Sequence, residues 1–358
     1  MRNMAKERNT DEIYMSRCIE LAQLGMGTVS PNPMVGAVIV YNSKIIGEGF
    51  HRQFGKPHAE VNAINSVRDK ELLKQSTIYV SLEPCSHFGK TPPCCDLIIR
   101  CGIPRVVVGI VDPFAKVKGR GIAKMKAAGI DVKTGVLEKE CEKLNRRFMM
   151  FQKHHRPYII LKWAQSMDGY IDGIHSGETS SKKPVCISNS LSHILVHKQR
   201  TEEAAILVGT NTALSDNPSL TVRSWSGKQP VRLILDRQNR LPDTLNVKDG
   251  SCPTIVFTEK ECTSKTNLIY ARLNFKENII PQINAYLYKN QIQSIVVEGG
   301  RQLLQSYIDL GIWDESLVFI GNKWLGNGVH APLLKAIPVK SERLGDDTLL
   351  IFHNHINL

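Results

Sequence analysis

The sequence predicts an α/β protein built from two domains. Its 358 residues are enough for two units that each bury a core. Short apolar runs rich in β-branched residues alternate with helical patterns along most of the chain, which is typical of largely parallel sheets covered by helices. A polar, basic stretch at 151–157 ends in proline and interrupts this alternation. We therefore expect a first domain at 1–150, a linker at 151–157 and a second domain at 158–358.

In the first half, Thr10 is predicted to cap a helix that runs from about Asp11 to Leu24. Two strands at 35–40 and 44–50, joined through Asn42 and Ser43, predict a hairpin. A second helix is expected to open at His58. Its expected inward positions are Val61, Ile64 and Val67. The next expected elements are strand 77–81, a helix from Pro93 to about 101, strand 105–111, helix 122–128, strand 130–135 and a helix from 138.

The same alternation continues in the second half of the chain. Expected strands lie at 158–164, 205–208, 231–235, 254–257 and 294–297, with helices near 279–289 and 301–310. The stretch 173–184 is rich in Gly, Ser, Thr and Lys, which predicts a mobile loop.

Composition and cysteine usage indicate a soluble cytoplasmic protein. Apolar residues make up 42% of the chain, and no apolar run reaches the roughly 18 residues typical of a membrane span. The charged N-terminal residues lack the apolar core of a secretory signal. Nine scattered cysteines are an odd number, which favours buried thiols, metal ligands or catalytic groups over disulfides.

The formal charge of +12 is compatible with a nucleic-acid partner, with anionic small molecules or with a merely solvated basic surface. The Lys and Arg residues are spread along the chain without a basic tail or stripe. Charge alone therefore leaves these alternatives open.

One set of residues has the spacing of a catalytic metal site. His58 and Glu60 lie at a helix start after a hairpin, Pro84-Cys85 ends the next strand, and Cys94 lies at the next helix start. This order matches the zinc nucleobase deaminases. His58, Cys85 and Cys94 are thus predicted to bind zinc and to leave one position open for water. Glu60 is the expected proton carrier beside a water whose pKa zinc lowers to about 7.

Two neighbours compete for roles at this site. Cys95 is an alternative ligand to Cys94, and since adjacent helix residues differ by about 100° in direction, only one of them is expected to face the metal. His87 lies in the insert between the cysteines. It can contact substrate, replace a ligand or remain solvated.

The chain resembles the bifunctional riboflavin-biosynthesis deaminase/reductase family over almost its whole length. The matching stretches of the first half are Pro31–Gly36, His58–Glu60 and Glu83–Cys94. Those of the second half are Arg156–Tyr158, Lys162–Gly169, Ile206–Arg223 and Val297–Gly300. The insert 86–93 separates this family from tRNA and cytidine deaminases, whose second and third ligands are usually two residues apart.

The resemblance implies a cytidine-deaminase-like α/β/α domain followed by a dihydrofolate-reductase-like α/β domain. It implies zinc-dependent deamination of 2,5-diamino-6-ribosylamino-4(3H)-pyrimidinone 5′-phosphate and then NADPH-dependent reduction of the ribosyl group to ribityl. The implied deaminase substrate contacts are Asn32, His87 and Lys90. The implied NADPH contacts are Ala164, Thr212, Asp216, Gly300, Arg301, Gln302, Leu303, Leu304, Gln305 and Ser306. The implied reductase substrate contacts are Lys162, Arg200, Leu220, Arg223 and Glu298.

One stretch of the second half supports a phosphate-binding role, and another departs from the family pattern. Glu298-Gly299-Gly300 follows a strand and opens a helix, so backbone N–H groups can approach a phosphate, although a bare Gly-Gly turn is the simpler alternative. Arg200 and Arg223 suit a ribose phosphate. In many members Gly-Glu-Ser precedes a Trp-containing stretch, whereas here Gly177-Glu178-Thr179 is followed by an insert and by Cys186–Asn189.

Two other functions remain to be weighed. A deaminase acting on a base in RNA fits the charge but leaves the Gly-Gly turn and the paired arginines of the second half unexplained. A zinc-stabilised binding protein without turnover would not need Glu60. We expect a phosphorylated pyrimidine as substrate, no nucleic-acid or membrane partner, and a homo-oligomer.

Overall fold

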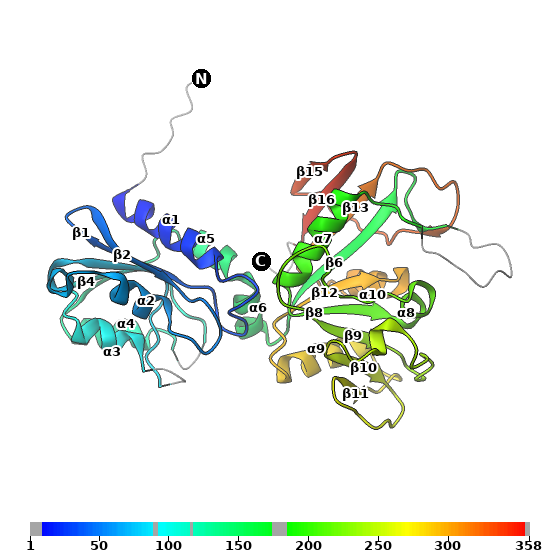
Figure 1. The fold of residues 1–358 in the computed structure, drawn as a ribbon, viewed down its shortest axis with the longest axis horizontal. Helices are drawn as coiled ribbons and strands as arrows, with labels where there is room; N and C mark the ends of the chain where they lie inside the picture. The colour runs from blue at the N-terminus through cyan, green and yellow to red at the C-terminus, as the bar shows by residue number, and fades with distance from the viewer. Residues whose placement is uncertain (1–8, 89–91, 115–116, 174–184, 355–358) are drawn as a thin grey trace, which may run out of the picture. The chain divides into compact units, whose positions relative to one another are not determined.

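A computed structural model of the chain describes residues 9–88, 92–114, 117–173 and 185–354. The fold divides into two compact units, Met1–His155 and Arg156–Leu358 (Figure 1). Residues 151–154, placed in a linker by the sequence, continue helix α6 (Arg146–His154). Among the described residues, no helix has the length and apolar character that crossing a bilayer requires.

The first unit is built on a five-stranded sheet with the order β2-β1-β3-β4-β5. Its strands are β1 (Gly36–Tyr41), β2 (Lys44–Phe50), β3 (Thr77–Leu82), β4 (Arg105–Ile110) and β5 (Asp131–Thr134). β1 runs antiparallel to β2 and β3, whereas β3, β4 and β5 run parallel. The predicted hairpin is confirmed: Asn42 and Ser43 connect β1 to β2 with φ of 45° and 58°, as two-residue hairpin turns require.

Helices cover both faces of this sheet, as the α/β/α expectation requires (Figure 1). They are α1 (Thr10–Gln23), α2 (Ala59–Ser66), α3 (Cys94–Arg100), α4 (Arg120–Ala127), α5 (Glu138–Leu144) and α6, with a 3₁₀ turn at Lys70–Gln75. Buried residues of α2, α3 and α4 form one core with Ile39 and Val80. Those of α1, α5 and α6 form another with Val38 and Tyr79. Alternating strand residues thus fill opposite cores.

Two local predictions in this unit are wrong. Asn9, not Thr10, caps α1, because its side chain accepts a hydrogen bond from the Asp11 N–H at 3.2 Å while Thr10 already belongs to the helix. Ile64 and Val67 are buried as expected, but Val61 is only half-buried. The buried positions of the first turns of α2 are instead Ala59, Glu60 and Ala63, whose small alanines allow close packing on β2.

The second unit contains a nine-stranded sheet with the order β11-β10-β9-β8-β12-β6-β13-β16-β15. Its strands are β6 (Tyr158–Ser166), β8 (Ala205–Gly209), β9 (Val231–Leu235), β10 (Thr254–Thr258), β11 (Leu268–Arg272), β12 (Ser294–Gly299), β13 (Glu315–Gly321), β15 (Lys340–Leu344) and β16 (Asp347–His353). Every neighbouring pair from β11 to β13 is parallel, and β16 runs antiparallel to β13 and β15.

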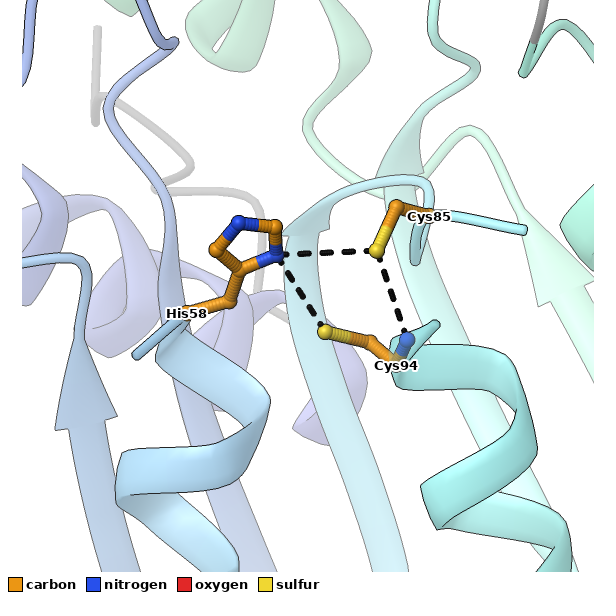
Figure 2. A group of neighbouring side chains, drawn as sticks. All are labelled: His58, Cys85 and Cys94. Carbon is orange, nitrogen blue, oxygen red and sulfur yellow. Dashed lines mark hydrogen bonds between the residues drawn. The ribbon is translucent and has the colours of Figure 1, made fainter. Parts of the chain in front are cut away.

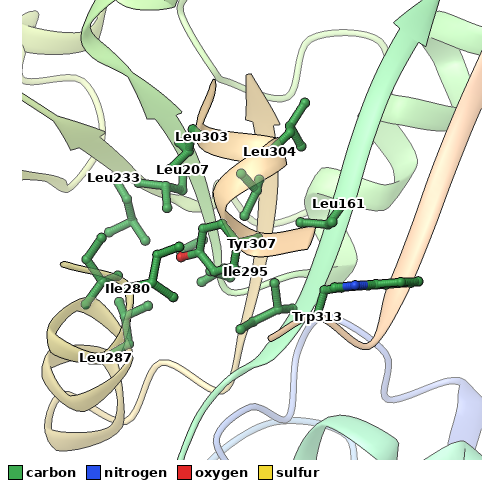
Figure 3. Packing of buried hydrophobic residues seen from close by; sticks show 14 of the residues in the cluster. Leu161, Leu207, Leu233, Ile280, Leu287, Ile295, Leu303, Leu304, Tyr307 and Trp313 are labelled. Atoms are coloured by element: carbon green, nitrogen blue, oxygen red, sulfur yellow. The ribbon is translucent and has the colours of Figure 1, made fainter. Parts of the chain in front are cut away.

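The remaining elements of this unit are α7 (Ser190–Glu202), α8 (Thr210–Asp216), α9 (Ile279–Lys289), α10 (Arg301–Asp309), a 3₁₀ turn at Asn246–Lys248, and the short pair β7 (Tyr170–Asp172) and β14 (Val329–His330). Figure 3 shows Leu287, Leu304 and Tyr307 from α9 and α10 packed with Leu161 and Ile295 of the sheet. This core holds β6, β8 and β12 side by side. Their carboxyl ends therefore meet at one edge, where α/β sheets bind ligands.

Candidate active sites

Three elements of the first unit bring one imidazole and two thiols together. His58 precedes α2, Cys85 follows β3, and Cys94 is the first residue of α3. His58 Nδ1 lies 3.5 Å from Cys85 Sγ and 3.3 Å from Cys94 Sγ. The three donor atoms all lie within 4.8 Å of one another, and Figure 2 shows them facing a common point.

This donor set fits zinc. Zn–S bonds of about 2.3 Å and Zn–N bonds of about 2.0 Å at tetrahedral angles place nitrogen and sulfur roughly 3.6 Å apart. The observed separations of 3.5 and 3.3 Å are close to that value. A hydrogen bond with Cys94 and another with His58 also lower the pKa of the Cys85 thiol to about 4 although burial opposes the shift. The thiolate that a metal needs is thus favoured.

Cys95, the alternative ligand, faces the interior. Its side chain is fully buried in the core beneath α2 and α3, and its Sγ contacts Asp96 Oδ1 at 3.5 Å. Burial raises the pKa of its thiol to about 11. The rotation of about 100° between neighbouring helix residues separates it from Cys94, and only Cys94 joins the cluster.

Glu60 lies in the first turn of α2, two residues after His58, with 3% of its surface exposed. Burial, followed by the charge of Cys85, raises the pKa of its carboxyl to about 7, against a smaller lowering by His58. A carboxyl group that titrates near neutrality can both accept and return a proton, which is what a general acid–base catalyst requires.

Asn32 is connected to the cluster through a residue that sequence reasoning missed. Asn32 Nδ2 lies 3.1 Å from His51 Nε2, and His51 Nδ1 lies 3.1 Å from the Pro57 carbonyl. The His51 ring, 2% exposed, packs edge-on against His58 with centroids 5.3 Å apart. An N–H on Nδ1 leaves Nε2 to accept from the Asn32 amide. No spacing pattern in the sequence points to His51.

The other predicted deaminase substrate contacts lie in the insert between the cysteines. His87 Nδ1 is buried and has no hydrogen-bond partner among the described residues. Its ring meets Phe114 at a centroid distance of 6.1 Å. A buried ring nitrogen without a partner is unusual and is consistent with a place for a ligand group. Lys90 lies outside the described residues.

In the second unit, three charged side chains from distant parts of the sequence form one buried cluster. Arg200 on α7 donates from Nη2 and Nε to Glu298 on β12, at 2.7 and 3.1 Å, and Lys162 Nζ on β6 lies 3.9 Å from the same carboxylate. Burial raises the pKa of Glu298, but Arg200 and Lys162 outweigh it and lower the pKa to about 2. Burial lowers the pKa of Lys162.

The predicted reductase substrate contacts Arg200, Leu220 and Arg223 differ in their surroundings. Arg200 also donates from Nη1 to the Thr221 carbonyl at 3.0 Å, so its guanidinium is committed to protein groups on two sides. Leu220 is 3% exposed and packs in a core with Ile206 and Val208. Arg223 is exposed, and its backbone N–H donates to His197 Nδ1 at 3.1 Å.

The Gly-Gly turn packs against the start of α8. The Gly300 N–H donates to Thr212 Oγ1 at 2.9 Å, and a Cβ on Gly299 would lie 3.0 Å from the Thr212 methyl. Glycine is therefore needed for this close approach, and the Gly300 N–H already has a partner. No side-chain hydrogen bond caps α10, so the N–H groups of its first turn remain suited to a phosphate.

The side chains predicted to contact NADPH divide into two groups. Leu303 and Leu304 are buried in the core, Gln305 bonds to the backbone of Leu333, and Ser306 Oγ donates to the Gln302 carbonyl. These four side chains are occupied by contacts within the protein, whereas no side chain caps the first turn of α10. In the second group, Ala164 lies near the end of β6, Thr212 and Asp216 lie on α8, and Arg301 and Gln302 begin α10.

In the segment that departs from the family pattern, Ile187 and Asn189 make defined contacts with the rest of the second unit. Ile187 is buried and packs so closely on Gly321 that a Cβ there would lie 2.2 Å from the Ile187 carbonyl oxygen. Asn189 caps α7 by accepting from the Ser192 N–H at 3.0 Å. Gly177, Glu178 and Thr179 lie outside the described residues.

Comparison with known proteins matches a family model to each of the two units. Residues 8–110 match the model described as cytidine and deoxycytidylate deaminase zinc-binding region, and residues 157–350 match the RibD C-terminal domain. The riboflavin biosynthesis protein RibD of Aquifex aeolicus is 40% identical over 97% of this chain and 99% of its own. The chain belongs to the RibD family. RibD of Escherichia coli is 38% identical, covering 88% of this chain and 89% of its own.

A solved structure supports the same assignment for the fold. The diaminohydroxyphosphoribosylaminopyrimidine deaminase/5-amino-6-(5-phosphoribosylamino)uracil reductase of Thermotoga maritima is 39% identical and has a TM-score of 0.86, with 96% of this chain and 98% of that chain covered. This member of the family is therefore a bifunctional enzyme of riboflavin biosynthesis, a deaminase followed by a reductase, with Zn²⁺ and NADPH as cofactors. The expectations for fold, activity and cofactors are confirmed.

Proposed function

We propose that the first unit deaminates 2,5-diamino-6-ribosylamino-4(3H)-pyrimidinone 5′-phosphate at a zinc ion held by His58, Cys85 and Cys94. The observation that carries this proposal is the three-donor cluster with Glu60 buried beside it. Bound zinc supplies a Lewis acid that makes water nucleophilic at neutral pH. Within our proposed boundaries this activity belongs to residues 1–150, with 151–157 as the connection.

Glu60 moves the proton. Its carboxylate accepts a proton from the attacking water and returns it to the departing amine, a task suited to a group with a pKa of about 7. Asn32 holds the pyrimidine through an amide that His51 orients. His87 offers its unpartnered Nδ1 to the substrate. Lys90 completes the proposed set with a charge for the phosphate.

The second unit, 158–358, reduces the sugar of the deaminated product. NADPH supplies the hydride to C1′. Lys162 and Glu298 lie on the neighbouring strands β6 and β12 and face the sugar, and Arg200 fixes the Glu298 carboxylate for hydrogen bonds to sugar hydroxyls. Arg223 is exposed and available to the ribose phosphate, three residues after Leu220 in the chain.

The cofactor lies at the carboxyl edge of the sheet. The first turn of α10, at Arg301 and Gln302, would hold its diphosphate through backbone N–H groups, with Gly300 as the N-cap beside it. Thr212 and Asp216 on α8 and Ala164 on β6 flank it. Leu303, Leu304, Gln305 and Ser306 support the turn from within α10.

A coupled assay tests this assignment. Wild-type protein with the pyrimidine substrate and NADPH is expected to release ammonia first and to oxidise NADPH afterwards, each followed separately. Glu60→Gln should keep one zinc per chain, lose ammonia release by a factor of about 10² or more, and still oxidise NADPH when given the deaminated product. Equal ammonia release by wild type and variant would make the assignment of Glu60 wrong.

We further propose a free phosphorylated pyrimidine, rather than RNA, as the substrate of a cytoplasmic homo-oligomer. All nine cysteines are free thiols, which suits a reducing compartment. Trp324, Leu333 and Ile337 are 75%, 62% and 84% exposed, and a second copy can cover apolar side chains of this kind. Light scattering that gives the mass of one chain, or editing of a tRNA substrate, would contradict the respective proposal.

A further inference from the structure

Glu83 is a buried carboxylate that binds a loop instead of a metal. It lies two residues before Cys85 and is 3% exposed. Four backbone N–H groups donate to it. Oε1 accepts from Gly121 at 3.0 Å and Ile122 at 3.3 Å, and Oε2 accepts from Gly119 at 2.9 Å and Asp112 at 3.3 Å. Each oxygen thus serves two donors.

Asp112 and Gly119 belong to the connection between β4 and α4, of which residues 111–114 and 117–119 are described, and Gly121 and Ile122 belong to the first turn of α4. The N-cap of α4, Gly119, supplies no side chain for the first turn of the helix, and Glu83 takes that place from a distant strand end. The negative charge also suits a helix N-terminus. The Glu83 carboxylate therefore fixes where this connection lies.

Backbone packing holds the same connection from a second side. A Cβ on Gly121 would lie 2.3 Å from the carbonyl oxygen of Pro84, the residue between Glu83 and Cys85. The Glu83 N–H donates to the Ile110 carbonyl at 3.0 Å, at the end of β4. The connection is thus bound to the short segment that presents Cys85.

The connection reaches the deaminase site through Phe114. The Phe114 ring packs edge-on against His87, and the Phe114 N–H donates to Asp112 Oδ1 at 2.8 Å. Asp112 in turn is 7% exposed and donates its own N–H to Glu83. A continuous series of contacts therefore leads from the Glu83 carboxylate to the ring of His87.

We propose that Glu83 is a positioning residue of the deaminase, which places Phe114 behind His87 and thereby sets the orientation of the His87 ring toward the substrate. This inference rests on the proposed function, in which His87 contacts the pyrimidine. It assigns Glu83 no contact with substrate or metal. Its loss should weaken substrate binding while the ligand set stays intact.

Two variants disturb the connection from opposite sides. Glu83→Gln keeps the size of the side chain but turns one of its acceptors into an NH₂ group that faces two N–H donors. Gly121→Ala leaves the carboxylate unchanged and pushes the first turn of α4, and with it the connection, away from Pro84. If Glu83→Gln does not fold, Gly121→Ala provides the same test.

Asp11→Asn is the matched control. Asp11 is another buried carboxylate of this unit, which accepts from Arg105, Lys133 and Tyr79 at 2.7 to 3.2 Å. Arg105 begins β4, whereas the connection held by Glu83 leaves the other end of that strand. The control therefore removes a comparable buried anion without touching the segment behind His87.

The measurements are zinc per chain, thermal midpoint, KM and kcat for ammonia release, and NADPH oxidation by the same chain. Both test variants should retain one zinc and normal NADPH oxidation while KM for the pyrimidine rises roughly tenfold or more. Asp11→Asn should lower the thermal midpoint and leave KM unchanged.

Other outcomes separate the two hypotheses. A wild type that releases no ammonia from the pyrimidine would refute the proposed function. If the wild type is active, test variants with the KM of Asp11→Asn would overturn the positioning role. Loss of zinc from both test variants would also overturn it, because Glu83 would then support the metal ligands instead.

Discussion

The two candidate active sites of this protein are assembled in different ways. The proposed zinc ligands come from three successive elements between His58 and Cys94, each at the end of a strand or the start of a helix. The reductase cluster joins Lys162, Arg200 and Glu298, which meet only because β12 inserts between β6 and β8. The first site depends on local chain order and the second on sheet topology.

The electrostatics of the two sites differ accordingly. The first site joins one imidazole and two thiols, and a metal ion is needed to bring two thiolates together stably. In the second site the carboxylate of Glu298 is already compensated by Arg200 and Lys162 at 2.7 and 3.9 Å. We therefore expect the first site to respond to metal removal and the second to the loss of a single charge.

Zinc removal should produce the largest difference between the two activities. Chelation is expected to abolish ammonia release, because no residue of the cluster replaces the Lewis acid. NADPH oxidation with the deaminated product should be unchanged, and added Zn²⁺ should restore deamination. A parallel loss of both activities that zinc reverses would show that the reductase also depends on the metal.

Glu298→Gln should have the next largest effect, confined to the second unit. Removing the carboxylate leaves Lys162 and Arg200 facing each other in a buried place, and breaking such a group typically costs roughly 3–5 kcal/mol of unfolding free energy. NADPH oxidation should fall at least tenfold while ammonia release persists. Denaturant unfolding and the two separate assays measure these changes.

Asp314→Asn is the matched control for that variant. Asp314 forms a buried pair with Arg156 at 2.7 and 2.8 Å in the same unit, at the start of β6 and away from its carboxyl end. The control should lose comparable stability but keep the KM for the deaminated product. If both variants lost activity in proportion to stability, Glu298 would have only a structural role.

The pH dependence of stability gives a second readout for Glu298. Its pKa is about 2 in the folded protein against about 4.3 for an unfolded glutamate. A lowered pKa contributes stability that is complete above the unfolded value and is lost as the pH falls through about 4 toward 2. The stability difference between wild type and Glu298→Gln should therefore shrink over this range.

The zinc cluster could be predicted from the sequence because its residue types and order are themselves the signal. The choice between Cys94 and Cys95 could not be predicted, because spacing alone places both near the metal. Only the packing of the folded unit shows that the Cys95 side chain lies in the core. His51 and Glu83 were missed for a related reason. They act through hydrogen bonds to residues that no periodic pattern connects with them.

In the second unit, strands β6, β8, β9, β10 and β12 were predicted from the sequence, but β11, β13 and the functional cluster were not. Lys162, Arg200 and Glu298 entered through the family resemblance, because strand order cannot be read from chain order. Helix α7, which carries Arg200, received no prediction. Only Ser192 and His197 of this helix are buried, so it lacks the apolar stripe that marks a helix in sequence.

The smallest predicted effect tests the division of labour between the adjacent cysteines. Cys95→Ala removes one buried sulfur from the core of the first unit and should cost roughly 1 kcal/mol of unfolding free energy. Zinc content and ammonia release should stay at wild-type values, because the Cys95 thiol faces Asp96 and the core rather than His58. Cys94→Ala should lose zinc. If Cys95→Ala loses zinc as well, the two thiols exchange as zinc ligands. The local order of the chain would then determine the first site less strictly than the buried ion pairs determine the second.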